Sequence, residues 1–272
     1  MVGKSKFFRL TKANLKRAFG FRFFISAILV ICFMLFDVWG DLEFIVEDPK
    51  DMSVWYYYFF SVVMMGTYSS NMFPLLAALP FAANYCEEQQ AGVTPLIVSR
   101  SSKRSYCISK MLVCTIAGGL ALFFGVLLHT VVLSTQLSLC NSEALQQMQG
   151  LPYYTALANG TGAGYFLIGA YLAFLRGALY ASAAITVSAY ITNKYVTIAS
   201  PFIIHFIAVR LYVILKVPNQ ARLDLLLRGR TEVHSGATTL ILVTVIVIVL
   251  IIICGLIFTR KVRRKITYES VS

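Results

Sequence analysis

The chain has 272 residues, of which 58% are hydrophobic and only 13% are charged, and its mean hydropathy is +0.73. A soluble globular protein needs a larger polar fraction to cover its surface, so this composition excludes that class and indicates an integral membrane protein. The formal net charge of +12 would suggest nucleic acid in a soluble chain. Here the positions of Lys and Arg fit membrane topology instead, and no nucleic-acid partner is predicted.

The N-terminal segment, residues 1–20, mixes aromatic and aliphatic side chains with Lys and Arg. Phe7, Phe8, Leu15 and Phe19 are interspersed among the basic residues. This pattern predicts an amphipathic interfacial helix that lies at the inner headgroup surface and connects to the first membrane span. A solvated basic tail is the alternative interpretation.

Six apolar segments approach the 17 to 25 residues, roughly, that a membrane-spanning helix requires. They are Phe21–Phe36, Trp55–Asn84, Met111–Val132, Tyr165–Tyr190, Val196–Leu215 and Ala237–Phe258. The fold class predicted is therefore an all-α integral membrane protein with six transmembrane helices, forming one domain over residues 1–272.

The second of these segments is too long for one straight crossing. As a helix it would extend about 45 Å, against a hydrocarbon core of about 30 Å. We expect it to tilt or bend near Pro74 and Pro80, with Ser69 and Asn71 available to satisfy freed backbone groups.

The distribution of basic residues predicts the topology. If both termini are cytoplasmic, 17 of the 24 Lys and Arg residues face the cytoplasm and five face outside, while Arg176 and Arg210 lie within spans. The predicted location is the plasma membrane. The acidic outer segment, residues 37–52, is interpreted as a solvated connector because it lacks the spacing of a calcium loop.

Sequence motifs for catalysis are absent. The chain has no P-loop for ATP, no HExxH and no nucleophile elbow, and its six cysteines show no CxxC pairing. We therefore expect no enzymatic activity in this chain, no catalytic residue, no metal site and no cofactor of its own.

The polar segment 85–110 interrupts two apolar spans and is predicted to be a structured cytoplasmic loop. Thr94 is expected to cap a short helix with Pro95 at its first position, and Ser101 or Ser102 to cap the helix that continues into the next span. An amphipathic, partly basic helix at a membrane face is a candidate docking surface.

The fourth span carries a stripe of small residues, Gly169, Ala173, Gly177 and Ala181, so that this face can approach another helix closely. Arg176 lies in the middle of the span, where a charge costs roughly 2.5–3.5 kcal/mol. Structural anchoring and a role in a substrate pathway are both open for it.

The segment 216–236 is expected to be an external interfacial or re-entrant element. Within it, residues 219–229 predict an amphipathic helix that Asn219 caps and Gly229 ends. Its arginines would then reach lipid phosphates.

These features together resemble the permease subunits of ABC-2-type transporters, with a type V exporter-like transmembrane domain. In that family an acidic residue and a glycine precede a short coupling helix, and basic positions follow it. The matching positions are Glu87 or Glu88, Gly92, Val93–Val98 with Thr94 and Pro95, Arg100, Arg104 and Lys110.

The resemblance implies a bacterial exporter of a peptide, antibiotic or lipid-like substrate. Separate ATPase subunits, which carry ATP and Mg²⁺, would dock on the 85–110 loop, and a second copy or a homologous permease would complete the substrate path. Arg176, Gly169, Gly177 and Asn71 are the candidates for pathway or packing residues. The alternative is a non-transporting membrane scaffold or accessory subunit.

Overall fold

The computed structural model describes residues 2–43, 52–64, 66–158 and 162–269. Throughout these residues the regular secondary structure is helical, with one isolated β-bridge between Ser53 and Ser138, so the all-α prediction is confirmed. Residues 44–51, which form half of the expected acidic connector 37–52, lie outside the described part. The longer helices are α1 (Val2–Ala18), α2 (Phe21–Asp37), α5 (Thr67–Ala78), α8 (Lys103–Leu133), α11 (Ala163–Ser188), α12 (Lys194–Ile214) and α14 (Gly236–Glu269).

Four described helices, α8, α11, α12 and α14, are long and apolar enough to cross a membrane. Residues of α1 and α2 form a bent pair, with 48° between the two helices, that passes the same test together. The structure therefore has the helices of a multi-pass membrane protein. By length and composition the described residues contain four candidate spans, or five if the bent pair counts as one. The expected second span is not among them because it is broken into shorter helices.

The break in that span separates two helical stretches. Helix α4 (Val54–Tyr58) runs into a π-helical turn, η2 (Phe59–Val63), and the chain becomes helical again only at the start of α5. A carboxylate from another helix caps this new start: the Asp37 oxygens accept hydrogen bonds from the backbone N–H groups of Tyr68 at 2.7 Å and Ser69 at 2.9 Å. The expectation of one continuous apolar helix with its bend at the prolines was wrong at this point.

The two prolines of the segment take different roles. Pro74 lies inside α5, and Pro80 lies in the turn between α5 and α6 (Asn84–Gln90). The Ser69 hydroxyl donates to the Ser61 carbonyl at 2.6 Å, so it satisfies a backbone group at the broken junction. Asn71 donates to the carbonyl of Thr67 within its own helix.

Helices α8 and α11 form the centre of the bundle, and glycines allow them to approach closely. A Cβ on Gly118 of α8 would collide with Ala181 of α11 and would lie 2.5 Å from the carbonyl oxygen of Ala77. A Cβ on Gly177 would lie 2.5 Å from the Gly118 carbonyl oxygen. The expectation that the small-residue face of the fourth span packs on another helix is confirmed.

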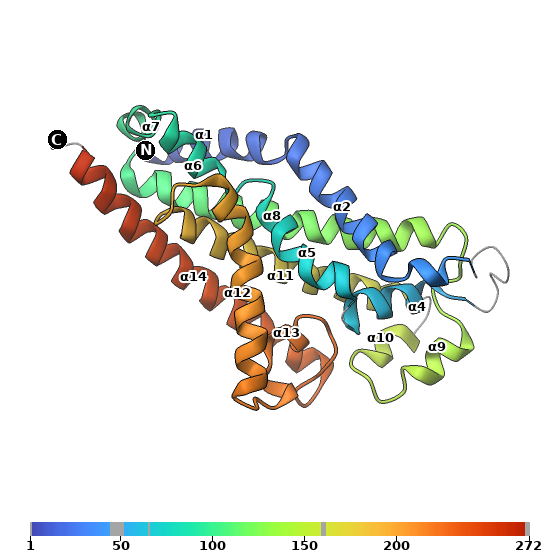
Figure 1. The fold of residues 1–272 in the computed structure, drawn as a ribbon. Helices are drawn as coiled ribbons and strands as arrows, with labels where there is room; N and C mark the ends of the chain where they lie inside the picture. Colours follow the sequence, from blue (N-terminus) through green and yellow to red (C-terminus); the bar gives the residue numbers. More distant parts are fainter. Residues whose placement is uncertain (1, 44–51, 65, 159–161, 270–272) are drawn as a thin grey trace.

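One end of the molecule gathers α1, α6, α7 (Thr94–Arg100) and the C-terminal part of α14 (Figure 1). The Lys103 ammonium donates to the Thr267 hydroxyl at 3.0 Å, and the Gln90 amide donates to the Thr192 carbonyl at 2.9 Å. These contacts bring the basic segments around residues 1–22, 85–110, 191–195 and 259–269 to the same end.

Helices α12 and α14 lie at the edge of the bundle (Figure 1). In the most apolar 18-residue stretch of each helix, only 22% of α12 and 11% of α14 is buried inside the protein. Exposed side chains such as Ile207, Leu211, Val245 and Ile252 give these helices surfaces suited to lipid or to a partner.

Candidate functional site

The segment 85–110 folds into a helix, a tight turn and two further helices. Helix α6 ends before Gly92, which adopts a positive φ of +67°, and α7 and then α8 follow. A residue with a side chain would be strained in this conformation, so glycine lets the chain reverse between α6 and α7. The structured loop expected at this position is confirmed.

The helix starts in this loop differ slightly from expectation. Pro95 lies in the first turn of α7 as expected, but the residue at the N-cap is Val93, and no side chain caps the helix there. Thr94 is the first residue of α7 and is buried, so its expected capping role was wrong. Ser102 does cap α8, since its hydroxyl accepts a hydrogen bond from the Ser105 N–H at 3.1 Å.

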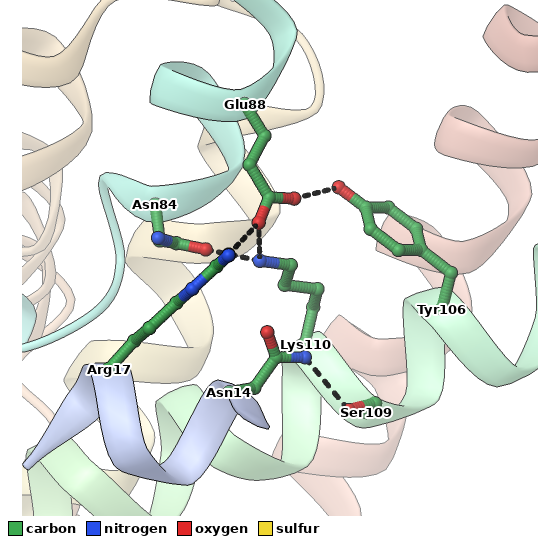
Figure 2. Close-up of polar contacts among 7 residues, drawn as sticks. All are labelled: Asn14, Arg17, Asn84, Glu88, Tyr106, Ser109 and Lys110. Carbon is green, nitrogen blue, oxygen red and sulfur yellow. Dashed lines mark hydrogen bonds and ion pairs between the residues drawn. The ribbon is translucent and has the colours of Figure 1, made fainter. Parts of the chain in front are cut away.

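A buried polar cluster connects this loop to the N-terminal helix, and Glu88 lies at its centre (Figure 2). The Glu88 carboxylate accepts hydrogen bonds from Lys110 Nζ at 2.6 Å, Arg17 Nη1 at 2.9 Å and the Tyr106 hydroxyl at 2.8 Å. One carboxylate therefore holds α1, α6 and α8 together. We call Arg17, Asn84, Glu88, Tyr106 and Lys110 the Glu88 cluster.

Lys110 is 0% exposed, yet its ammonium group is well satisfied. It donates to the Asn84 amide oxygen as well as to Glu88 (Figure 2). It also lies 5.0 Å from the centre of the Phe81 ring. A second contact, from the Asn14 amide to the Ser109 hydroxyl at 2.9 Å, joins α1 to α8 beside it. Removing one partner of such a buried pair typically costs about 3–5 kcal/mol, because the other charge is left uncompensated.

The neighbouring carboxylate, Glu87, has a different environment. It pairs with Arg22 Nη1 at 2.7 Å, and the Arg22 side chain is about half exposed. Exposed ion pairs contribute little to stability, roughly 0–1 kcal/mol. Sequence reasoning left Glu87 and Glu88 as alternatives for the acidic position, and only Glu88 is buried with Lys110.

The other expected site residues face outward on α7 and at the start of α8. Leu96 is 64% exposed, and Pro95, Arg100 and Arg104 are also exposed. Val98 and Thr94 are buried on the opposite face of the short helix. The structure therefore divides the predicted residues into an exposed face, suited to docking, and the buried Glu88 cluster behind it.

The chemistry of the Glu88 cluster is electrostatic and positional. Its members are a carboxylate, two cations, a phenol and an amide, and all are engaged with one another. In the part of the chain that the structure describes, no group of three or more His, Cys, Asp or Glu residues could hold a metal ion. The arrangement can fix the relative positions of three helices.

Sequence analysis missed three residues of the cluster: Arg17, Asn84 and Tyr106. Arg17 was counted only as one of many basic residues in an amphipathic segment, and it lies 71 positions from Glu88 in the chain. Asn14 offered a usable signal, because an uncharged polar residue on the packed face of an amphipathic helix needs a hydrogen-bond partner, and Asn14 is 2% exposed.

Two candidate pathway residues have packing roles. A Cβ on Gly169 would overlap the Tyr58 ring, so this glycine accommodates an aromatic side chain of α4. Gly177 lies against the α8 backbone, as described above. Arg176 is buried within α11, with its guanidinium carbon 4.7 Å from the centre of the Phe73 ring.

The segment 216–236, which was expected to be external, contains two very short helices in place of the single expected one. They are η3 (Asn219–Ala221) and α13 (Leu223–Leu226), and Gly229 has a positive φ of +72° shortly after them. Arg228 is buried and donates to the Ser70 hydroxyl of α5 at 2.7 Å. The expectation that Arg228 reaches lipid phosphates at the surface was wrong, because its side chain turns into the protein. Burial lowers the pKa of Arg228 from its ordinary value.

Comparisons with protein-family models, with curated proteins and with solved structures find no match for this chain. Function is therefore inferred from the residues and their geometry.

Proposed function

We propose that the chain is the membrane-spanning permease subunit of an ABC transporter, an exporter of ABC-2 type driven by a separate ATPase subunit. The observation that carries the proposal is the Glu88 cluster. It joins the N-terminal helix, α6 and α8, and Val98 on the buried side of α7 belongs to the same core as Tyr106. Force applied to α7 would pass through this junction into α8, which is a candidate membrane span.

The exposed face of α7 suits a protein partner. It presents an apolar side chain, Leu96, next to the positive charges of Arg100 and Arg104. A partner with an apolar pocket bordered by acidic residues would complement it, with the charges favouring orientation and encounter rate. ATP and Mg²⁺ would be bound by that partner, since this chain has no P-loop.

The placement of the basic segments supports a cytoplasmic position for this end. The inner segments expected from charge, which surround α1, α6 and α7, the α11–α12 turn and the end of α14, lie at one end of the molecule (Figure 1). Under the positive-inside rule this end faces the cytoplasm. The topology proposed is six crossings in the plasma membrane with both termini inside, where the broken α4–α5 stretch makes the second crossing.

A second permease copy, or a homologous permease, would complete the transport path. The apolar faces of α12 and α14, which are largely uncovered in the single chain, are available for that contact and for lipid. The substrate class that the ABC-2 resemblance suggests is a peptide, an antibiotic or a lipid-like molecule.

Co-purification tests the proposal. The tagged chain is extracted in mild detergent as the wild type, as Leu96→Asp/Arg100→Glu, and as Gln146→Glu, a control in α9 (Ser142–Gln147) at the other end of the molecule. We expect a protein with ATPase activity to co-purify with the wild type and the control but not with the α7 variant. Co-purification in all three would place the contact elsewhere. Absence of an ATPase from all three would favour a non-transporting scaffold.

A further inference from the structure

In the described part of the chain, two arginines are buried in the apolar part of the bundle and form no ion pair with an acidic residue. Arg176 of α11 is 4% exposed and Arg228, which follows α13, is 2% exposed. Among the described residues, Arg176 Nε and Nη2 and Arg228 Nε have no hydrogen-bond partner. Buried N–H groups of a charged side chain are rarely left in this state, because each gives up its hydration without replacement.

The two guanidinium groups lie on the same face of α5. Arg228 Nη2 donates to the Ser70 hydroxyl at 2.7 Å, and Arg176 lies over the ring of Phe73 at 4.7 Å. Ser70 and Phe73 are three residues apart in a helix, which places them one turn apart on one side. The positive charge of Arg228 acts on Arg176, so the two groups repel each other.

Neutral hydrogen-bonding groups adjoin this pair. The Tyr180 hydroxyl, one turn beyond Arg176 in α11, is 2.9 Å from His205 Nδ1 of α12. The nearby carboxylate, Asp224, is held by Arg222 through contacts of 3.0 and 3.3 Å. Asp224 therefore balances Arg222, and the charges of Arg176 and Arg228 remain in excess.

We propose that Arg176 and Arg228, with Ser70 and Tyr180 beside them, form a binding site for a phosphate group. A guanidinium fork matches the spacing of two phosphate oxygens, and two forks with two hydroxyls offer donors to all of them. Bound phosphate would remove the repulsion between the arginines and satisfy their free N–H groups.

The phosphate group can come from two sources, a phospholipid headgroup or a free phosphate ion. Both present the same oxygens to the arginines. A phospholipid headgroup could reach the site along α12, because His205 of α12 contacts Tyr180 and the outward side chains of α12 are apolar and exposed. The site is independent of the transport proposal, because it requires only that the folded chain bind phosphate.

Ligand-dependent thermal stability of the purified chain in a non-ionic detergent tests the site. The probes are phosphatidylglycerol, inorganic phosphate, and two phosphate-free references, a neutral glycolipid and chloride at matched ionic strength. We expect phosphatidylglycerol or phosphate to raise the melting temperature of the wild type above its reference. Stabilisation by the lipid alone identifies a headgroup site, and stabilisation by both, or by phosphate alone, identifies a site that accepts the free ion.

Arginine variants locate the binding. Arg176→Gln and Arg228→Gln should each weaken binding by about tenfold or more, because each loses a charge-assisted hydrogen bond. Arg210→Gln is the matched control, since Arg210 also lies on an apolar helix but is exposed to the surroundings, and it should bind as the wild type does. If either glutamine variant fails to fold, Ser70→Ala and Tyr180→Phe replace it, with a smaller expected loss.

Two results would overturn the proposal. One is a wild-type chain that neither phosphatidylglycerol nor phosphate stabilises beyond its reference. The other is an equal loss of binding in Arg210→Gln and in the variants of the site, which would show general attraction to basic surface charge.

Discussion

The buried pair of Glu88 and Lys110 gives a quantitative prediction. Lys110 is completely buried and the Glu88 side chain is 6% exposed, so neither charge can recover its hydration when the other is removed. Lys110→Met and Glu88→Gln should each lower the free energy of unfolding by about 3–5 kcal/mol. Lys110→Met should fall at the lower end of that range, because Arg17 and Tyr106 still donate to Glu88.

The double variant separates this explanation from simple loss of packing. With both charges replaced, no buried ion is left uncompensated, and the remaining Arg17 side chain is about half exposed to its surroundings. The loss of stability should therefore be smaller than the sum of the two single losses by about 1–3 kcal/mol. The control is Glu87→Gln, which breaks the exposed pair with Arg22 and should cost less than about 1 kcal/mol.

Unfolding in mixed micelles, with a denaturing anionic detergent titrated against a mild one and followed by far-ultraviolet circular dichroism, measures the four variants against the wild type. Strictly additive losses would refute the reasoning, because they would show that the two charges act independently. A control loss as large as that of Glu88→Gln would refute it as well, since burial would then make no difference.

Three further predictions use the same unfolding measurement or simple labelling. Gly118→Leu should lower the free energy of unfolding by about 1–3 kcal/mol or more, because its side chain would collide with α11. Gly255→Ala should be tolerated, because a Cβ there would lie 3.5 Å from its nearest neighbour, a side-chain atom of Met111. Equal effects of the two variants would contradict the packing described. Asp37→Ala should lower the free energy of unfolding by about 0.5–2 kcal/mol through loss of the cap of α5. Glu143→Ala, on the exposed side of α9, should change it little. An Asp37→Ala variant as stable as the wild type would contradict the capping role. A cysteine at position 96 and tags at both termini should react with impermeant reagents from the same membrane side, and reaction from opposite sides would contradict the proposed topology.

Local pattern was sufficient to predict much of the fold. Long apolar runs indicate α8, α11, α12 and α14, because a helix that crosses a membrane must satisfy its backbone internally. The four-residue spacing that includes Gly177 and Ala181 predicts a close helix contact, and α8 supplies the matching glycine, Gly118. The length of an apolar run and the spacing of small residues can each be read from one segment of sequence alone.

The break between η2 and α5 could not be predicted in this way. At the new helix start the capping oxygens come from Asp37, a residue of another helix 31 positions before Tyr68. Prolines mark where a helix is weakened, but they do not mark where a distant side chain stabilises a new start. The capping contact is tertiary, so a pattern within one segment does not reveal it.

The same distinction applies to the candidate site. Sequence reasoning selected Lys110 and the pair of adjacent glutamates, because these positions carry the resemblance to ABC-2 permeases. It could not tell Glu87 from Glu88, since adjacent residues of a helix point in directions about 100° apart. The packing of α1 and α8 around α6 determines which of the two is buried. Arg228 was placed at the surface because its segment is basic, whereas its side chain turns towards α5.

Photo-cross-linking at α7 tests the central proposal most directly. A photoreactive amino acid replaces Leu96 in one chain and Gln146 in another, and intact membranes are irradiated before extraction. The account predicts an adduct with an ATP-binding protein from position 96 only, with a yield that changes when ATP and Mg²⁺ are added. No such adduct at position 96, or the same adduct from both positions, would contradict the docking of an ATPase on α7.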